Sequence, residues 1–241
     1  MFNLKSNTVC VIILQVIILI IFMKTLAITG TNTDIGKTYA ACGIVRELKR
    51  RGIDVGVFKP FCSGSREDVE KLISASGVND TVEEVNPFFF EPPLAPYHAI
   101  KLNGGDIDIG KCIAAFDVLR QKHDLMIVEG AGGIMVPIME TQEGIYSFLD
   151  LFSDLASDII IVASRDLGTI NHSWLTAKVC GEAGLNVKGF IFNDTKPVEE
   201  KEPAISNPEI IEYCSGIPVL GIVKYDNPEP QWNSIVDKIL N

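Results

Sequence analysis

Residues 30–38 read Gly30-Thr-Asn-Thr-Asp-Ile-Gly-Lys-Thr38, and they lie between an apolar run at 25–29 and an amphipathic stretch at 39–51. A strand, a glycine-bounded loop and a helix in this order are typical of a phosphate-binding loop, although the spacing between the two glycines is one residue longer than usual. The backbone N–H groups of such a loop and the N-terminus of its helix attract a polyphosphate. We therefore expect Lys37 to reach the β- and γ-phosphates of a nucleotide and Thr38 to help hold Mg²⁺, with an ordinary strand–turn–helix corner as the alternative.

The rest of the chain repeats this alternation of apolar runs and helical-period stretches. Short Val- and Ile-rich runs separated by amphipathic segments are typical of βαβ units whose parallel sheet is buried on both faces. We expect an α/β fold, a doubly wound and mostly parallel sheet with helices on both faces, in a single domain at 23–241. The expected strands are 24–29, 54–58, 124–128, 158–163, 187–192 and 218–222, and the expected helices are 37–51, 66–76, 108–122, 171–184, 207–215 and 230–240.

Composition narrows the classes of partner. The chain has 241 residues and a net charge of −10, which argues against binding nucleic acid through phosphate neutralisation. A small anionic ligand can still bind an acidic protein at a local loop. The six cysteines show no metal-ligand spacing, so we expect reduced, largely buried thiols in a cytoplasmic protein.

The amino terminus departs from this pattern. Residues 9–23 are apolar except for Gln15, but the run is shorter than the roughly 20 residues that a bilayer span needs. No small-residue cleavage site follows it, as a signal peptide would require. We expect Met23 to be the native start and 1–22 to be an upstream extension, with a membrane anchor as the alternative, and we do not expect a membrane partner.

Polar residues follow several expected strands, at the edge of a parallel sheet where ligands bind. Lys59 and Ser63 follow the second strand, and Asp68 lies at the start of the next helix, where an acidic residue also suits the helix dipole. Glu129 follows the third strand and precedes three glycines within four residues, which would let the backbone approach a ligand. The structural alternatives are a solvated lysine, a plain N-terminal charge and an exposed turn glutamate.

Three further segments have local explanations as well as functional ones. Asn193 and Asp194 follow the fifth strand, where an amide could read a nucleobase or simply form a turn. The proline-rich stretch 86–98 is expected to be a fixed, non-helical loop, with His98 as a surface residue or a substrate contact. Asn171 is expected to cap a helix that starts at Ser173.

In combination these motifs resemble the dethiobiotin synthetase family. The resemblance covers about 24–225 and consists of GTNTDIGKT, FKPFCSG, APYHA, VEGAGG and LGTINHSWLT in that order, followed by the Asn-Asp pair. It implies a P-loop NTPase-like fold and an enzyme that uses MgATP, 7,8-diaminopelargonate (7,8-diaminononanoate) and CO2. It also implies a cytoplasmic homodimer whose substrate pocket lies at the subunit interface.

The resemblance also implies roles for individual residues. Lys37 and Lys59 would be catalytic, Ser63 would contact the substrate, and Thr38, Asp68 and Glu129 would form the metal site. The implied nucleotide site contains Asp34, Ile35, Gly36, Lys37, Thr38, Tyr39, Asp68, Glu129, Gly130, Ala131, Gly132, Asn193, Asp194, Val223, Lys224 and Tyr225.

Several positions depart from the family pattern, and two other protein classes carry a related phosphate loop. Asn32 replaces a common loop aspartate, Tyr97 stands where many members have histidine, and Lys224 replaces a frequent proline, which makes 223–225 the weakest part of the site. An amidotransferase acting on cobyrinic acid would need a glutaminase domain for which the chain has no room. A partitioning or positioning switch ATPase would carry a lysine early in the loop, where this chain has Thr31 and Asn32.

Overall fold

The computed structural model describes residues 25–103, 107–199, 201, 204–227 and 231–241. The expectations about 1–22 and the native start lie outside these ranges, as do the first residues of the strand expected at 24–29 and of the helix expected at 230–240. Among the described helices, none combines the length and apolar character that a bilayer span requires.

Six strands form one parallel sheet, as the apolar runs predicted. Their order across the sheet is β10-β9-β8-β1-β5-β2, and all neighbouring pairs are parallel. Buried Val and Ile side chains project from both faces of the central strands, which is why these runs are continuously apolar. The strands are β1 (Thr25–Gly30), β2 (Val55–Phe58), β5 (Leu125–Gly133), β8 (Asp158–Ala163), β9 (Asn186–Asn193) and β10 (Val219–Val223).

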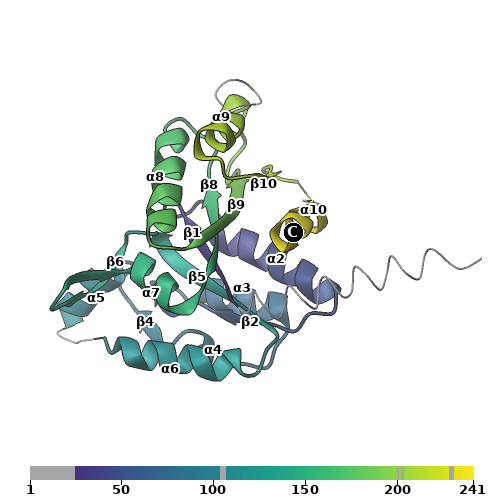
Figure 1. Ribbon diagram of the computed structural model, residues 1–241. Helices are drawn as coiled ribbons and strands as arrows, with labels where there is room; N and C mark the ends of the chain where they lie inside the picture. The colour runs from purple at the N-terminus through teal and green to yellow at the C-terminus, as the bar shows by residue number, and fades with distance from the viewer. Residues whose placement is uncertain (1–24, 104–106, 200, 202–203, 228–230) are drawn as a thin grey trace, which may run out of the picture.

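Helices cover both faces of this sheet, which confirms the doubly wound architecture (Figure 1). Leu26 and Ile28 of β1 pack toward one helical layer, and Ala27 between them packs toward the other, because successive strand residues point to opposite faces. The first layer contains α2 (Lys37–Arg50), α3 (Glu67–Ser76) and α10 (Trp232–Leu240). The second contains α6 (Ile109–Arg120), α7 (Phe148–Leu155), α8 (Thr169–Glu182) and α9 (Ser206–Ser215).

Several short elements were not expected from the sequence. A small parallel pair joins β3 (Phe61–Ser63) to β4 (Phe88–Phe90), and a hairpin joins β6 (Pro137–Thr141) to β7 (Gly144–Ser147). The short helix α4 (Val82–Val85) packs against α3 and α6, and the short helix α5 (Pro96–Asn103) packs against β3 of the parallel pair and β6 of the hairpin.

Three local expectations were wrong. The stretch 86–98 is not wholly non-helical, because α5 begins at Pro96, and a proline at the first helical position removes only an N–H that has no helical partner. Helix α8 begins at Thr169 after a left-handed Gly168 with φ of 94°, so Asn171 lies inside the helix and does not cap it. Glu129 lies within β5 rather than after it, because the strand continues until Gly133 pairs with Gly30.

Candidate nucleotide-binding site

A cavity of about 910 Å³ lies at the carboxyl end of the sheet. Its walls come from the phosphate loop, the first turns of α2, the segment after β2, the start of α3, the end of β5 and the loop 93–96. These segments are far apart in the sequence and meet because their parallel strands end at the same edge. The cavity thus lies at the edge of the sheet where the sequence predicted a site.

The loop between β1 and α2 has the backbone conformation of an anion-binding turn. Gly36 has a φ of 82°, and a Cβ built there would lie 2.2 Å from Nδ2 of Asn193, so a side chain is excluded by both strain and space. Lys37 Nζ donates to the carbonyl oxygen of Asn32 at 2.8 Å and thus lies across the loop. Burial lowers the pKa of Lys37 to about 8, because removing the ammonium from water disfavours its charged form.

Four polar side chains, from α2, α3, β5 and the segment after β2, meet on the floor of the cavity. Lys59 Nζ pairs with Glu129 Oε1 and lies 3.2 Å from Asp68 Oδ2, and Thr38 Oγ1 donates to the same Glu129 oxygen at 2.7 Å. Burial lowers the pKa of Lys59, but the carboxylates of Glu129 and Asp68 outweigh it and hold that pKa above its ordinary value. Burial raises the pKa of Asp68, but the Lys59 ammonium, a hydrogen bond from Thr38 and the charge of Lys71 together hold it below its ordinary value. The cluster is therefore an ammonium held between the carboxyl groups of Glu129 and Asp68.

This cluster has the donor chemistry of a hard-cation site. Glu129 Oε2 is buried and has no hydrogen-bond partner within the described residues, although a buried carboxylate oxygen normally has one. Thr38, Asp68 and Glu129 offer only oxygen atoms, which Mg²⁺ prefers together with water and phosphate oxygens. No group of three or more His, Cys, Asp or Glu side chains suited to a metal occurs among the described residues, so an ion here would need water or ligand oxygens as well. The donor set fits Mg²⁺ on that condition.

The outer part of the cavity includes the expected substrate residue. Ser63 lies at the end of β3, in the cavity wall beside Pro93 and Leu94. Cys62 also lines the cavity, but its Sγ donates to the carbonyl of Ser65 at 2.8 Å, and burial raises the pKa of its thiol. A protonated, hydrogen-bonded thiol is a poor nucleophile, so Cys62 acts as cavity wall.

The structure separates the expected site residues into two groups. Eleven lie in the cavity lining: Asp34, Gly36, Lys37, Thr38, Tyr39, Lys59, Ser63, Asp68, Glu129, Ala131 and Gly132. Among the described residues that form this lining, Ile35, Gly130, Asn193, Asp194, Val223, Lys224 and Tyr225 do not appear. The expected roles of the second group stay predictions.

Two members of the second group have hydrogen bonds within the protein. Asn193 Nδ2 donates to the carbonyl of Ile35 at 3.0 Å, so its amide holds the loop from below. The backbone N–H of Asp194 donates to the carbonyl of Val223 at 2.9 Å, and its carboxylate is bonded to Arg165. The carboxylate of Asp194 is thus engaged within the protein.

Some lining residues were missed by the sequence reading. Arg46 and Cys42 follow Tyr39 along one side of α2, and Lys71 faces the cavity from α3. The helical spacing of 39, 42 and 46 would have put them on one face, but the sequence alone does not say which face borders a cavity. Thr195 was missed because it lies one residue beyond the expected Asn-Asp pair.

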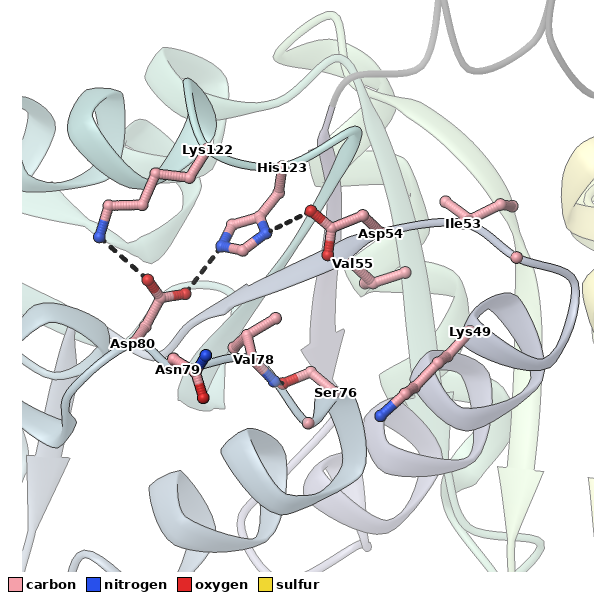
Figure 2. A pocket seen from close by; sticks show the side chains of 12 residues that line it. Lys49, Ile53, Asp54, Val55, Ser76, Val78, Asn79, Asp80, Lys122 and His123 are labelled. Carbon is pink, nitrogen blue, oxygen red and sulfur yellow. Dashed lines mark hydrogen bonds and ion pairs between the residues drawn. The ribbon is translucent and has the colours of Figure 1, made fainter.

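A second hollow, of about 680 Å³, lies at the amino end of the sheet (Figure 2). His123 lies between two carboxylates there, with Nδ1 3.0 Å from Asp54 and Nε2 2.7 Å from Asp80, and Lys122 Nζ lies 3.0 Å from Asp80 (Figure 2). We call Asp54, Asp80, Lys122 and His123 the His123 clasp. The contacts among these four side chains join three loops at the amino end of the sheet. We interpret the clasp as a structural feature, because it lies at the end of the sheet away from the phosphate loop.

The fold and the loop define the class: a doubly wound α/β protein with a phosphate-binding loop at the carboxyl end of its sheet. Solved structures agree, among them a ParA family ATPase from Chlorobium tepidum (TM-score 0.56, 15% identity, covering 90% of this chain and 99% of that one) and the MinD cell division protein from Aquifex aeolicus (TM-score 0.55, 16% identity, covering 90% and 95%). At these identities they show the fold alone. The family model described as "AAA domain" matches residues 24–229.

Curated relatives identify the family within this class. An ATP-dependent dethiobiotin synthetase BioD from Bacillus licheniformis is 40% identical over 86% of this chain and 89% of its own length. The protein of the same name from Methanococcus vannielii is 38% identical over 81% of this chain and 91% of its own length. The chain therefore belongs to the dethiobiotin synthetase family, as the ordered motifs predicted.

Proposed function

We propose that this chain is an ATP-dependent dethiobiotin synthetase, a ligase of biotin synthesis. It carboxylates 7,8-diaminopelargonate with CO2 and closes the cyclic urea of dethiobiotin, with release of ADP and phosphate. The observation that carries the proposal is the meeting of Lys37, Thr38, Lys59, Asp68 and Glu129 in one cavity beside the phosphate loop. Membership of the family supports it independently.

The proposed reaction has three steps. One substrate amine adds to CO2 to form a carbamate, and a carbamate oxygen attacks the γ-phosphorus of ATP while the bond to ADP breaks. The second amine then attacks the carbonyl carbon of this mixed anhydride, and phosphate leaves. Each step gathers negative charge at carbamate or phosphoryl oxygens, so cations aimed at these oxygens are the main requirement.

The two lysines meet that requirement from different sides. Lys37 lies across the phosphate loop, in position to hold the β- and γ-phosphates. Lys59 lies at the floor, is kept charged by its carboxylate neighbours, and is positioned to neutralise the carbamate and the transferred phosphoryl group. Ser63 at the cavity wall is the proposed contact of the diamine.

We assign Mg²⁺ to Thr38, Asp68 and Glu129, on the strength of the unpartnered Glu129 Oε2 and the all-oxygen donor set. When bound, the ion supplies positive charge to the phosphate oxygens. The remaining proposed nucleotide contacts are Asp34, Ile35, Gly36, Tyr39, Gly130, Ala131, Gly132, Asn193, Asp194, Val223, Lys224 and Tyr225.

The reaction itself tests the proposal. The full chain is incubated with 7,8-diaminopelargonate, MgATP and isotope-labelled bicarbonate, and labelled dethiobiotin is sought by mass spectrometry. We expect ATP-dependent product and, in Lys59→Ala, a fall in kcat of about 10²–10³ with little change in the KM for ATP, because Lys37 still holds the phosphates. ATP hydrolysis without labelled product would instead favour a switch ATPase, and equal losses in kcat and ATP affinity would contradict the role of Lys59.

The cellular location and the oligomeric state are also proposed. We propose a cytoplasmic location, which agrees with the free thiols of all cysteines in the described ranges. We also propose a homodimer with the substrate pocket at its interface. Sedimentation equilibrium of the active enzyme measures its mass, and full activity of a monomer would exclude the dimer.

A further inference from the structure

We propose that Arg165 is a positioning residue for the phosphate loop, acting through Asp194 and Asn193 without touching the nucleotide. The inference rests on the proposed nucleotide site. It follows from two observations. Arg165 and Asp194 form a buried ion pair to which the proposed reaction gives no role, and Asn193, next to Asp194, is hydrogen-bonded to the phosphate loop.

The ion pair is buried and bidentate. Arg165 Nε donates to Asp194 Oδ1 at 3.1 Å and Nη2 donates to Oδ2 at 2.5 Å, and both side chains are almost fully buried. Burying two charges costs desolvation energy that their attraction barely offsets, so such a pair is a weak source of stability. The planar guanidinium does fix the orientation of a carboxylate, because two parallel hydrogen bonds allow one geometry.

Arg165 is itself held in place from the opposite side. It follows β8, whose neighbours in the sheet are β1 and β9. Its Nη1 donates to the carbonyl of Ala204 at 3.4 Å, and Asn207 at the start of α9 donates to the backbone carbonyl of Arg165 at 3.0 Å. The backbone of Arg165 is therefore anchored to α9 and its guanidinium to the segment just before α9, so the side chain can hold Asp194 in a fixed position.

The three residues at 193–195 carry this constraint to the loop. Asp194 is fixed by Arg165 through its side chain and by Val223 through its N–H, and Asn193 immediately before it donates to Ile35 O at 3.0 Å. Because the peptide group is planar and trans, fixing the carbonyl of Ile35 also directs the N–H of Gly36 away from Asn193. Thr195 on the other side of Asp194 lines the cavity. Releasing Asp194 would free a peptide whose orientation the loop needs before phosphate arrives.

Calorimetry with two ligands tests the inference. Binding of Mg-ADP and of inorganic triphosphate, which has no base, is measured for the wild type, Arg165→Met and Arg165→Lys. We expect Arg165→Met to weaken both ligands by a similar factor, about tenfold, as a residue coupled to a site without touching it can do. Arg165→Lys should recover part of the loss because it keeps the charge. Faster amide exchange at Gly36 in Arg165→Met should accompany the loss.

A matched control separates positioning from stability. Arg51 at the far end of α2 also pairs with carboxylates, Glu47 and Asp237, and Arg51→Met should lower the melting temperature without changing either affinity. Unchanged affinities in Arg165→Met, or loss of ADP binding alone, would overturn the inference. If Arg165→Met does not fold, Arg165→Lys, which keeps the charge but cannot form the bidentate pair with Asp194, must still weaken both ligands by a similar factor. If the wild type binds neither ligand, the nucleotide site itself is wrong.

Discussion

At the residue scale, the ammonium of Lys59 lies where the proposed Mg²⁺ would bind. Its ammonium lies between Glu129 and Asp68, two of the three proposed metal ligands, and bonds the same Glu129 oxygen as Thr38. In the ligand-free protein the lysine therefore supplies the positive charge that a cation would supply. A bound Mg²⁺ would compete with the charged Lys59 for these carboxylates, and Lys59 would then be free to turn toward the substrate.

This competition predicts the behaviour of Lys59→Met. Removing the ammonium leaves Glu129 buried without its ion partner, which should lower the free energy of unfolding by about 3–5 kcal/mol. Mg²⁺ without nucleotide should then restore part of the loss, because it binds the vacated carboxylates, whereas it should have little effect on the wild type. Urea unfolding with and without Mg²⁺ measures both effects.

Lys37→Met is the control for that experiment. Lys37 donates to a carbonyl of the loop and not to the carboxylates, so its removal should give no Mg²⁺-dependent recovery. Equal responses to Mg²⁺ in the wild type and in Lys59→Met would show that Lys59 and the ion do not share a site.

The residues of this cluster could be predicted from the sequence, and Arg165 could not. Lys59 and Glu129 stand where buried strands approach the functional edge, and their motifs are ordered as in the family. Arg165 stands in an equivalent place, but its partner Asp194 is one residue past a different strand. Only the register of β8 against β9 brings the two together, and register is not visible in a continuous apolar run.

At the scale of elements, the contact between α2 and α10 depends on one glycine. A Cβ built at Gly43 in α2 would lie 2.2–2.5 Å from three ring atoms of Trp232 in α10. Alanine normally stabilises a helix relative to glycine by about 1 kcal/mol, but the rigid indole cannot yield without moving α10. We expect Gly43→Ala to lower the free energy of unfolding by about 1–3 kcal/mol, as overpacking does.

Gly181→Ala in α8 provides the matched comparison. A Cβ there would meet open space, so only the helical preference acts and stability should rise by about 0.5–1 kcal/mol. Denaturant unfolding of the two variants measures the signs. The same sign in both would show that the indole does not determine the effect at Gly43.

The first turn of α4 carries a pH-dependent contact. Hydrogen bonds from Lys122, first, and from Thr81 lower the pKa of Glu84 to about 2 from its ordinary 4.5. A carboxylate with a depressed folded-state pKa stabilises the protein above pH 4.5, and this contribution disappears as pH falls through about 2.

Glu84→Gln, which keeps the capping-box acceptor and removes the charge, should therefore cost about 0.2–1 kcal/mol at neutral pH, a small value because the side chain is exposed. The difference from the wild type should shrink as the pH is lowered through that range, as measured by urea unfolding at a series of pH values. A difference independent of pH would assign the effect to geometry and not to charge.

Long elements were predictable and short ones were not. Helices α2, α3 and α6 and all six sheet strands have repeated apolar periods, and the structure places them close to the expected ranges. The β3–β4 and β6–β7 pairs have three to five residues per strand and too few periods to be recognised. Their stability depends on packing against other elements, such as α5 against β3 and β6, and such tertiary packing leaves no local sequence pattern.

At the scale of the whole molecule, the proposed nucleotide site and the His123 clasp lie at opposite ends of the parallel strands. The phosphate loop, Lys59 and Glu129 lie at the carboxyl end of the sheet, while the His123 clasp closes its amino end (Figure 2). The sequence predicted the parallel sheet and its functional edge, because both follow from alternating periods. The strand order, with β5 between β1 and β2, requires long-range pairing that no local pattern contains.

This separation predicts that one substitution changes stability but not ligand binding, and that another changes ligand binding but not stability. His123→Gln breaks contacts to Asp54 and the buried Asp80, and should lower the free energy of unfolding by about 1–3 kcal/mol, the cost of leaving buried polar groups with fewer partners. Lys37→Met removes a buried ammonium with a lowered pKa, so stability without ligand should change little.

Mg-ADP at a hundred times its Kd should add about 2.7 kcal/mol to the free energy of unfolding of the wild type and of His123→Gln, because the proposed site is intact in both. The same concentration should add much less to Lys37→Met, whose loop has lost its phosphate-binding cation. Thermal unfolding of the three proteins with and without Mg-ADP measures these effects. A smaller Mg-ADP increment in His123→Gln than in the wild type would show that the two ends of the sheet are energetically coupled.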